Sequence, residues 1–243
     1  MAKPENLDDN NSVILVDGSS YVYRAYHALP PLTTSTGQPT GAVRGVVTMV
    51  MRILQDHPNA PVGMVFDAKG DTFRHEMYED YKANRAAMPD DLIPQIEPIH
   101  EVIKALGIKI FVVEGVEADD VIGTLAKEGE AEGLDVFIFS GDKYFAQLIT
   151  EHVFLYSPIV RSREINIIDP DGVQEKWGVP PEKFIDYLGL MGDTSDNIPG
   201  VMGVGKKTAA KLIQEYGSLE GALENAENVR NKRVREGLIN GIE

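Results

Sequence analysis

The amino-acid sequence predicts an α/β protein with a mostly parallel central sheet, helices on both faces of that sheet, and a smaller helical subdomain after it. Short apolar runs of strand length recur in the first part of the chain, and helical patterns separate them. Nearly continuous apolar strands are typical of a parallel sheet that helices cover on both sides. Beyond about residue 178 the pattern changes to short helices and Gly-rich turns, which predicts the helical subdomain.

The apolar runs define four expected strands, and the segment after the first strand shows the helical pattern most clearly. Residues 40–54, "TGAVRGVVTMVMRIL", carry apolar side chains at the i, i+3, i+4, i+7 spacing of one helix face. The expected face consists of Val43, Val46, Val47, Val50, Met51 and Leu54. The strands are expected at 12–18, 61–68, 108–115 and 135–142.

Composition and periodicity divide the chain into three parts. Residues 1–12 form a polar, acidic tail, residues 13–177 the α/β core, and residues 178–243 the helical subdomain. Within the core, the connection 70–91 is long and non-periodic, and connections of this length are usually functional or disordered.

The overall composition excludes several classes of protein. The 243 residues are 43% hydrophobic, enough for a full core, and include no Cys, which excludes disulfides and thiolate metal sites. Neither a signal peptide nor a membrane span is expected, because no apolar run has the required position or length. We therefore expect a soluble, cytoplasmic protein. Its net charge of −15 is unusual for a nucleic-acid binder, whose footprint is normally basic.

Acidic residues follow the predicted strands. Three of them end the first, second and fourth strands, and three more open the helix after the third strand. The carboxyl ends of parallel strands share one sheet edge, where ligands bind. Each acid alone is better explained as a helix cap or a first-turn residue, but their succession at four strand ends favours a cluster. The six acids are Asp17, Asp67, Glu117, Asp119, Asp120 and Asp142.

Such a cluster requires cations or protons. Two unit charges about 4 Å apart repel by roughly 4 kcal/mol at an effective dielectric constant of about 20. Hard divalent ions prefer oxygen ligands, and Mg²⁺ or Mn²⁺ fits better than zinc because neither His nor Cys accompanies the acids.

Two segments of the helical subdomain carry further candidate residues. In "LMGDTSDNIPG", Asp193 and Asp196 are expected on one side of a helical turn closed by Pro199 and Gly200; the alternative is an acidic turn in which Asp196 or Asn197 acts as a cap. In "GVMGVGKKTAAKLI", glycines precede a helix that begins with lysines, a pattern that presents backbone N–H groups and positive charge to a DNA phosphate. Its alternative is an ordinary tight turn. The candidate DNA-binding residues there are Gly203, Gly205, Lys206, Lys207 and Lys211.

The connection 70–91 carries its own cations. Tyr81, Lys82 and Arg85 fall within little more than one helical turn, so that a phenol could stack on a base while the cations hold a phosphate. The alternative is a solvated surface segment. Arg24, in the helix after Asp17, is similarly ambiguous between a surface residue and a phosphate contact.

Taken together, the motifs resemble a known family. The stretches "VDGSSYVYRAYHALPPL", "VFDAKGDTFRHEMYEDYKANR", "GVEADDVIGTLA", "FSGDK" and "LMGDTSDNIPGVMGVGKKTA" are similar to the 5′ nuclease domain at the N-terminus of bacterial DNA polymerase I, a member of the flap endonuclease family. The resemblance runs from about Val13 to Gly217. It implies a PIN-like 5′ nuclease fold with a helical arch at 70–91 and a helix-hairpin-helix-type subdomain.

The resemblance also implies an activity and its partners. A hydrolase of this family cuts phosphodiester bonds at 5′ ends and flaps of branched DNA, including RNA primers, in replication and repair. Two Mg²⁺ or Mn²⁺ ions are implied, and K⁺ at the hairpin. A nucleoid-associated monomer is expected, with polymerase domains in a longer parent chain and a truncated C-terminal subdomain.

Residue by residue, the resemblance assigns roles to the candidates. Asp17, Asp67, Glu117, Asp119 and Asp120 match the acids of the first metal, whereas Asp142, Asp193 and Asp196 match those around the second. Tyr81, Lys82 and Arg85 match the arch through which the 5′ strand passes, and Arg24 matches a phosphate contact. The residues themselves agree with such a mechanism, because a two-metal site needs no side-chain nucleophile. Without these eight acids the net charge would be about −7, so the acidity is not an objection to DNA binding.

Residue 144 departs from the family pattern. The family has a second acid at this position, "GDKD", whereas this chain has "GDKY". A neutral phenol cannot replace an anion, so Tyr144 should weaken the second ion more than the first. Three interpretations stay open: a working nuclease with weaker metal affinity, a DNA-binding domain that cuts poorly, or a change that traps substrate. A non-catalytic scaffolding domain and a PIN-like ribonuclease are the alternatives from other classes.

Overall fold

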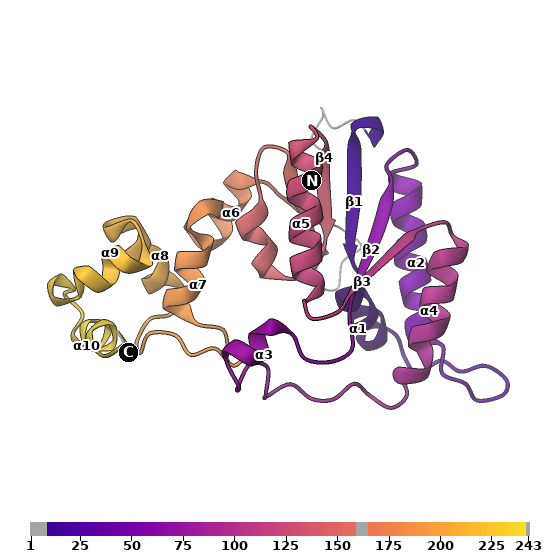
Figure 1. Ribbon diagram of the computed structural model, residues 1–243, viewed down its shortest axis with the longest axis horizontal. Coiled ribbons are helices and arrows are strands. Elements are labelled where there is room, and N and C mark those ends of the chain that lie inside the picture. Colours follow the sequence, from indigo (N-terminus) through magenta and orange to yellow (C-terminus); the bar gives the residue numbers. More distant parts are fainter. Residues whose placement is uncertain (1–8, 159–164, 242–243) are drawn as a thin grey trace. The chain divides into compact units, whose positions relative to one another are not determined.

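The structure is a computed structural model that describes residues 9–158 and 165–241 (Figure 1). The strands are β1 (Ser12–Asp17), β2 (Val62–Asp67), β3 (Lys109–Val113), β4 (Asp135–Phe139), β5 (Val153–Pro158) and β6 (Ile165–Ile168). The α-helices are α1 (Gly18–Ala28), α2 (Gly41–Asp56), α3 (Phe73–Met77), α4 (Ile93–Ala105), α5 (Ala118–Ala131), α6 (Pro170–Trp177), α7 (Phe184–Met191), α8 (Lys206–Tyr216), α9 (Leu219–Glu224) and α10 (Lys232–Asn240). Short 3₁₀ helices are η1 (Asp9–Asn11), η2 (Lys143–Leu148), η3 (Pro181–Lys183) and η4 (Ala226–Asn228).

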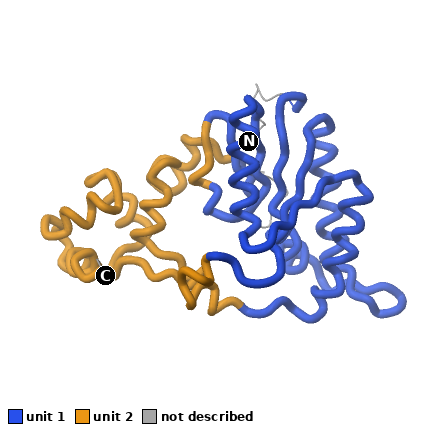
Figure 2. The backbone as a smooth tube through the Cα atoms, viewed as in Figure 1, with its two compact units in different colours: residues 1–73, 86–145, 151–167 blue, residues 74–85, 146–150, 168–243 orange. Residues whose placement is uncertain are grey.

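The chain folds into two compact units, neither of which is continuous in sequence (Figure 2). Unit 1 comprises residues 1–73, 86–145 and 151–167, and unit 2 comprises residues 74–85, 146–150 and 168–243. None of the described helices has the length and apolar character needed to cross a membrane.

Unit 1 is built on a six-stranded sheet in the order β3-β2-β1-β4-β5-β6. The strand pairs β1–β2, β1–β4, β2–β3 and β4–β5 are all parallel, which confirms the predicted, mostly parallel sheet. The four predicted strands correspond to β1 to β4. The strands β5 and β6 were not expected from the sequence, because β5 ends in the polar and strand-breaking pair Ser157 and Pro158, and β6 has only four residues.

Helices cover both faces of this sheet (Figure 1). On one face α1, α2 and α4 pack together over Ile14, Val16 and Phe137. On the other face α5 lies along β1 and β4, where Gly129 approaches Val136 closely. Successive residues of a strand point to opposite faces, so the continuous apolar runs supply both layers at once.

The buried face of α2 differs slightly from the predicted one. Val46 and Val50 are buried as expected, but Met51 is 38% exposed. The buried face is centred instead on small residues, because a Cβ on Gly45 would lie 2.6 Å from the Cβ of Ala25 in α1. The prediction of the buried face used only the positions of large apolar side chains, whereas the close approach of two helices depends on small residues.

Unit 2 contains helices α6 to α10 and the segment Arg74–Arg85 of the long connection. Its core includes the fully buried Phe184, Tyr187 and Leu190 of α7 together with Leu238 of α10. The helical character of this part of the chain was expected. That it also takes in a segment from about 100 residues earlier was not.

Replacing Gly45 with Ala is expected to lower the free energy of unfolding by about 1–3 kcal/mol, because the added methyl group overpacks the α1–α2 contact. This loss should occur even though Ala favours helix over Gly by about 1 kcal/mol. Urea unfolding measures it. The exposed neighbour variant Arg44→Ala should change stability by less than about 0.5 kcal/mol, and equal effects of the two variants would contradict the packing described here.

Candidate active site

Asp17 connects the first strand of unit 1 to its first helix. It is the last residue of β1 and the N-cap of α1, and its Oδ1 accepts the Ser20 N–H at 2.9 Å. Its Oδ2 accepts a hydrogen bond from the Ser140 hydroxyl at 2.7 Å, and the residue is only 5% exposed. One carboxylate therefore both caps a helix and lies buried at the carboxyl edge of the sheet.

Two serines that sequence analysis did not single out hold the acids in place. The fully buried Ser140 donates to Asp17, and its oxygen accepts the Asp142 N–H at 3.0 Å. The Ser19 hydroxyl oxygen similarly accepts the Asp67 N–H at 3.1 Å. The available signal was the position of each serine, directly beside the end of a strand in "FSGD" and "VDGSS".

Burial and mutual repulsion raise the pKa of two of these acids. Burial raises the pKa of Asp17 to about 6, against two hydrogen bonds that lower it. Burial also raises the pKa of Asp119 to about 8, and the charges of four neighbouring acids add to this effect. The structure thus brings five of the six predicted acids of unit 1 into one electrostatic environment. The four neighbours of Asp119 are, in order of effect, Asp142, Asp17, Asp67 and Glu117.

Backbone N–H groups fix the direction of several carboxylates. Asp67 Oδ1 accepts the Ala118 N–H at 2.9 Å, and Asp120 Oδ2 accepts the Glu117 N–H at 3.0 Å within a capping box at the start of α5. Asp120 is therefore in part a capping residue, the alternative that the sequence left open. Its role as a metal ligand stays a prediction.

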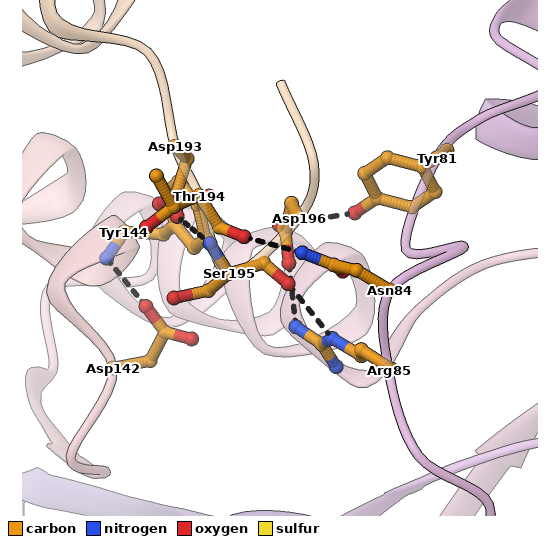
Figure 3. A network of polar contacts seen from close by, with 9 residues as sticks. All are labelled: Tyr81, Asn84, Arg85, Asp142, Tyr144, Asp193, Thr194, Ser195 and Asp196. Atoms are coloured by element: carbon orange, nitrogen blue, oxygen red, sulfur yellow. Dashed lines mark hydrogen bonds and ion pairs between the residues drawn. The ribbon is translucent and has the colours of Figure 1, made fainter. Parts of the chain in front are cut away.

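The turn after β4 differs in one respect from the expectation. The strand ends at Phe139, so Asp142 lies in the following turn and not at the end of the strand as predicted. Its Oδ1 accepts the Tyr144 N–H at 2.8 Å (Figure 3). The Lys143 ammonium lies 5.4 Å from the centre of the Tyr144 ring. This segment therefore presents a carboxylate beside a phenol and an ammonium group.

The chemistry of these residues fits a hard divalent cation. The acids at this edge of the sheet offer carboxylate oxygens, which hard divalent cations prefer as ligands, and burial followed by the charges of four neighbouring acids raises the pKa of Asp119. In the described ranges, no group of three or more His, Asp or Glu side chains is arranged to hold an ion directly. The hydrogen bonds from backbone and serine groups would orient the carboxylates as outer partners orient metal ligands.

The acidic pair of unit 2 lies in a turn of a different kind from the predicted one. Asp193 and Ile198 form an antiparallel bridge after α7 has ended at Met191, so the helical turn expected for Asp193 and Asp196 is wrong. Gly192 and Gly200 approach each other closely at the base of this turn: a Cβ on Gly192 would lie 2.3 Å from the Gly200 backbone nitrogen. Gly192 ends the helix before the two acids, whereas their i, i+3 spacing suggested a helical turn.

Both acids of this turn are buried and hydrogen-bonded. Asp193 Oδ1 accepts the Ser195 N–H at 2.7 Å. Asp196 Oδ1 forms an ion pair with Arg85 Nη2 at 2.5 Å, and its Oδ2 accepts the Tyr81 hydroxyl at 3.3 Å (Figure 3). Asp196 is 3% exposed and forms its ion pair with the guanidinium of Arg85.

Tyr81 is not the exposed phenol that the sequence suggested. It is 5% exposed, its hydroxyl is bound to Asp196, and the Lys82 ammonium lies 4.9 Å from the centre of its ring. A buried ring cannot stack on a base, so the stacking role expected for Tyr81 does not fit this arrangement. Arg24, on α1, is partly buried, and its charge acts on Tyr21.

The Gly-rich hairpin leads into α8, which begins at Lys206 as expected. Gly203 has a φ of 85°, a conformation that favours glycine, and space for its Cβ is taken by the Arg233 side chain. Gly205 is the N-cap of α8, with nothing near the position of a Cβ. Open space at this helix start is compatible with the close approach of a backbone.

Cations from other elements surround the predicted lysines. Burial, followed by the charge of Lys206, lowers the pKa of Lys176. Lys207 and Lys211 line a hollow of about 570 Å³ together with Arg230 from the segment before α10. Lys176 and Arg230 were not expected at this surface, because neither lies near the Gly-rich motif in the sequence.

A parallel sheet with acids along its carboxyl edge, joined to a helical unit with a Gly-rich hairpin and lysines, defines an α/β nuclease. The chain belongs to the 5′-3′ exonuclease family. Residues 12–178 match the N-terminal resolvase-like domain of 5′-3′ exonucleases, and residues 179–243 match their C-terminal SAM-fold domain. The family consists of 5′-3′ exonucleases and flap endonucleases, which are hydrolases.

Curated relatives agree over nearly the whole chain. DNA polymerase I of Pseudomonas aeruginosa is 57% identical over 205 residues, which are 84% of this chain and 22% of that protein. DNA polymerase I of Rhizobium leguminosarum is 45% identical over 245 residues, 98% of this chain and 24% of that protein. The 5′-3′ exonuclease of Buchnera aphidicola is 40% identical over 227 residues, 93% of this chain and 78% of that protein. The chain thus spans less than a quarter of the length of these two polymerases.

Solved structures share the fold. T5 5′-exonuclease with bound divalent metal ions (zinc) superimposes with a TM-score of 0.78 at 23% identity, over 93% of this chain and 83% of that chain. The catalytic core of Rad2 in complex with a DNA substrate gives a TM-score of 0.62 at 16% identity, over 97% and 74% of the two chains. At these identities the likeness shows the fold alone.

The stability of the protein without divalent ions is expected to fall as the pH rises from about 4 to about 8. The folded pKa values of Asp17 and Asp119 lie above the ordinary value of 3.8, so the folded state binds more protons than the unfolded state within this window. For Asp17 alone, the pKa of about 6 corresponds to a loss of about 3 kcal/mol. Chemical unfolding at a series of pH values in EDTA measures this effect.

Asp119→Asn should remove most of the pH dependence above pH 6, whereas Glu224→Gln, at an exposed position of α9, should leave it unchanged. Millimolar Mg²⁺ should raise stability most at pH 8, where the carboxylates are ionised. A stability that does not vary between pH 4 and 8 would contradict the clustering of these acids.

Proposed function

We propose that this chain is a structure-specific 5′ nuclease that hydrolyses phosphodiester bonds at 5′ ends and flaps of branched DNA, including RNA primers. The observation that supports this most strongly is the electrostatic coupling of Asp17, Asp67, Glu117, Asp119 and Asp142 at one sheet edge. Such a cluster needs compensating cations, and phosphodiester hydrolysis by two ions is chemistry that uses them. Membership of the 5′-3′ exonuclease family supports the nuclease part of this proposal independently.

We assign the first of two Mg²⁺ or Mn²⁺ ions to Asp17, Asp67, Glu117, Asp119 and Asp120. When bound, these ions would activate water and stabilise the leaving oxygen. The second ion is assigned, from the family resemblance, to Asp142, Asp193 and Asp196.

Basic residues would act on the phosphate itself. Lys82 and Arg85 would stabilise negative charge on the scissile phosphate, and Arg24 would hold a neighbouring phosphate. No His or Ser of this chain is required as a nucleophile. These basic residues would bind and orient the phosphate and neutralise its charge. The specificity for a 5′ end would come from the segment that carries Lys82 and Arg85.

The Gly-rich hairpin would grip duplex DNA independently of sequence. Gly203, Gly205 and the start of α8 would offer N–H groups to a phosphate, with K⁺ bound at the hairpin and charge from Lys206, Lys207 and Lys211. The relatives named DNA polymerase I support a further proposal, that polymerase domains accompany this nuclease in a longer parent chain. The family resemblance leads us to propose that it acts as a monomer.

Tyr144 would reduce cleavage without abolishing DNA binding. In place of a second anion, the chain has a phenol whose backbone N–H supports Asp142 and whose ring faces the Lys143 ammonium. A neutral group there removes one negative charge from the environment of the second ion, so the affinity for that ion should fall.

Replacing Tyr144 with Asp is expected to restore metal affinity, and the rate of 5′ flap cleavage at low Mg²⁺ should rise by about 10-fold or more. At high Mg²⁺ the cleavage rates of the two proteins should become similar. A titration of Mg²⁺ under single-turnover conditions measures this, with flap affinity determined in parallel in Ca²⁺. Tyr144→Phe serves as the control and should behave as the parent chain, because it also lacks an anion. Equal cleavage rates of the Asp variant and the parent at low Mg²⁺ would sink the proposal.

A non-catalytic DNA-binding domain is the competing function that the neutral Tyr144 favours. It predicts flap binding without cleavage even at high Mn²⁺, for the parent chain. Substrate preference tests the ribonuclease alternative, since a PIN-like enzyme would prefer single-stranded RNA over flapped DNA.

Lys207→Ala and Lys211→Ala are each expected to weaken binding of duplex DNA about equally for different sequences, and to reduce the slope of log affinity against log salt by about 1. Fluorescence anisotropy at several KCl concentrations measures both quantities. Lys127→Ala, at an exposed position of α5, should leave the slope unchanged. A slope that changes equally in all three variants would show that the hollow beside α8 is not a preferred binding surface.

A further inference from the structure

Two segments of unit 2 that are about 110 residues apart in the sequence are joined by a dense set of hydrogen bonds (Figure 3). One is the segment 78–85 of the long connection, and the other is the turn 194–197. We call their joint structure the clasp. All four consecutive backbone carbonyls of the turn accept a hydrogen bond from the segment. Thr194 O accepts from Asn84 Nδ2 at 2.7 Å, Ser195 O from Arg85 Nε at 3.3 Å, Asp196 O from the Lys82 N–H at 3.0 Å, and Asn197 O from the Tyr78 hydroxyl at 3.3 Å.

One hydrogen bond of the clasp is donated by the turn and accepted by the segment. Asn197 Nδ2 donates to the Asp80 carbonyl oxygen at 2.8 Å. The buried carboxylate of Asp196 adds its ion pair with Arg85 and its hydrogen bond from Tyr81. The turn and the segment therefore satisfy each other's polar groups, through the backbone as well as through side chains.

The backbone of the clasp is strained on both sides. In the part of the chain that the structure describes, Lys82 and Asn197 are the two non-glycine residues with positive φ, at 56° and 59°. Each of them is fixed by a bond to the other segment, Lys82 through its N–H and Asn197 through its side-chain amide. Strained conformations persist only where the surroundings determine them, and they are concentrated at functional and switching sites.

The turn is a rigid base for this contact. The bridge between Asp193 and Ile198 closes it, and the crossing of Gly192 and Gly200 leaves no room for a side chain. The segment 78–85 forms consecutive tight turns after α3 ends at Met77, closed by internal backbone hydrogen bonds such as Arg85 N–H to Lys82 O at 2.9 Å. These local bonds shape each turn, whereas the bonds to 194–197 determine where the segment lies on the turn.

We infer that Asn84 and Asn197 are positioning residues, which hold the segment 78–85 in one register on the turn 194–197 and so fix where the cationic groups of Lys82 and Arg85 are presented. Neither asparagine needs to touch the substrate. The role of the clasp in cleavage rests on the proposed function of Lys82 and Arg85. Its role in ordering the segment does not.

Trypsin provides a direct test, because Lys82 and Arg85 are themselves its cleavage sites. Asn84→Ala removes the bond to Thr194, and Asn197→Gly removes the bond to Asp80 while keeping a residue that accepts positive φ. In each variant, cleavage after Lys82 and Arg85 should accelerate by about 10-fold or more, while cleavage after the exposed Lys69 should not change. Asn228→Ala is the matched control, since this exposed asparagine of unit 2 makes only a 3.4 Å side-chain contact with Asn225.

Unchanged cleavage after Lys82 and Arg85 in a folded Asn84→Ala or Asn197→Gly variant would overturn the inference. Circular dichroism and thermal unfolding establish that the variants are folded. The two variants break different bonds, so if one of them fails to fold, the other decides. Asn84→Gln, which keeps an amide donor, should restore part of the protection, whereas a purely steric role of Asn84 would give none.

Single-turnover flap cleavage tests the consequence for function. Both variants should lower the rate constant by about 10- to 100-fold with an unchanged dissociation constant for the flap, whereas a contact that merely binds DNA would change the dissociation constant instead. A changed dissociation constant with an unchanged rate constant would overturn the positioning role. If the parent chain proves not to cleave, the proposed function fails while the trypsin result still decides the ordering role of the clasp.

Discussion

Repulsion among carboxylates at the carboxyl edge of the sheet is the constraint on which the rest of unit 1 depends. Parallel strands end at the same edge, so placing an acid at each end brings like charges together whatever the surrounding residues are. The structure accommodates this by burying Asp17 against the Ser140 hydroxyl and by directing backbone N–H groups at Asp67 and Asp142. Burial and then the remaining repulsion raise the pKa of Asp119. A site that is unfavourable by itself is what a divalent cation can bind.

Much of the fold could be predicted from the sequence, because its main signals are local. A buried parallel strand must be a continuous apolar run, and the runs at β1 to β4 are of that kind. The acids at Asp17 and Asp67 were found because they end such runs. The signal failed where the elements were short or bordered by breakers, as at β6, and where small residues such as Gly45 decided which face of a helix is buried.

The candidate site was less predictable, since its supporting contacts join residues that are distant in the sequence. Nothing near Ser140 indicates a bond to Asp17, 123 residues away. The i, i+3 spacing of Asp193 and Asp196 suggested a helical turn, but Gly192 ends the helix and a bridge takes over. Tyr81 shows the same limit: its neighbours in the sequence are polar, yet it is buried, and its hydroxyl is bound to Asp196, 115 residues later.

The discontinuity of unit 2 has a consequence for how the chain can be divided. By sequence, the C-terminal family domain begins at residue 179. By compactness, the same unit also includes the segment Arg74–Arg85, which lies inside the stretch matched by the N-terminal domain. A fragment cut at the sequence boundary would leave the carbonyls of 194–197 to water and the carboxylate of Asp196 without its guanidinium partner. The boundary between the two family domains therefore does not coincide with the boundary between the compact units. A domain exchanged with a relative would have to keep its own side of the clasp, 78–85 or 194–197, matched to the other side.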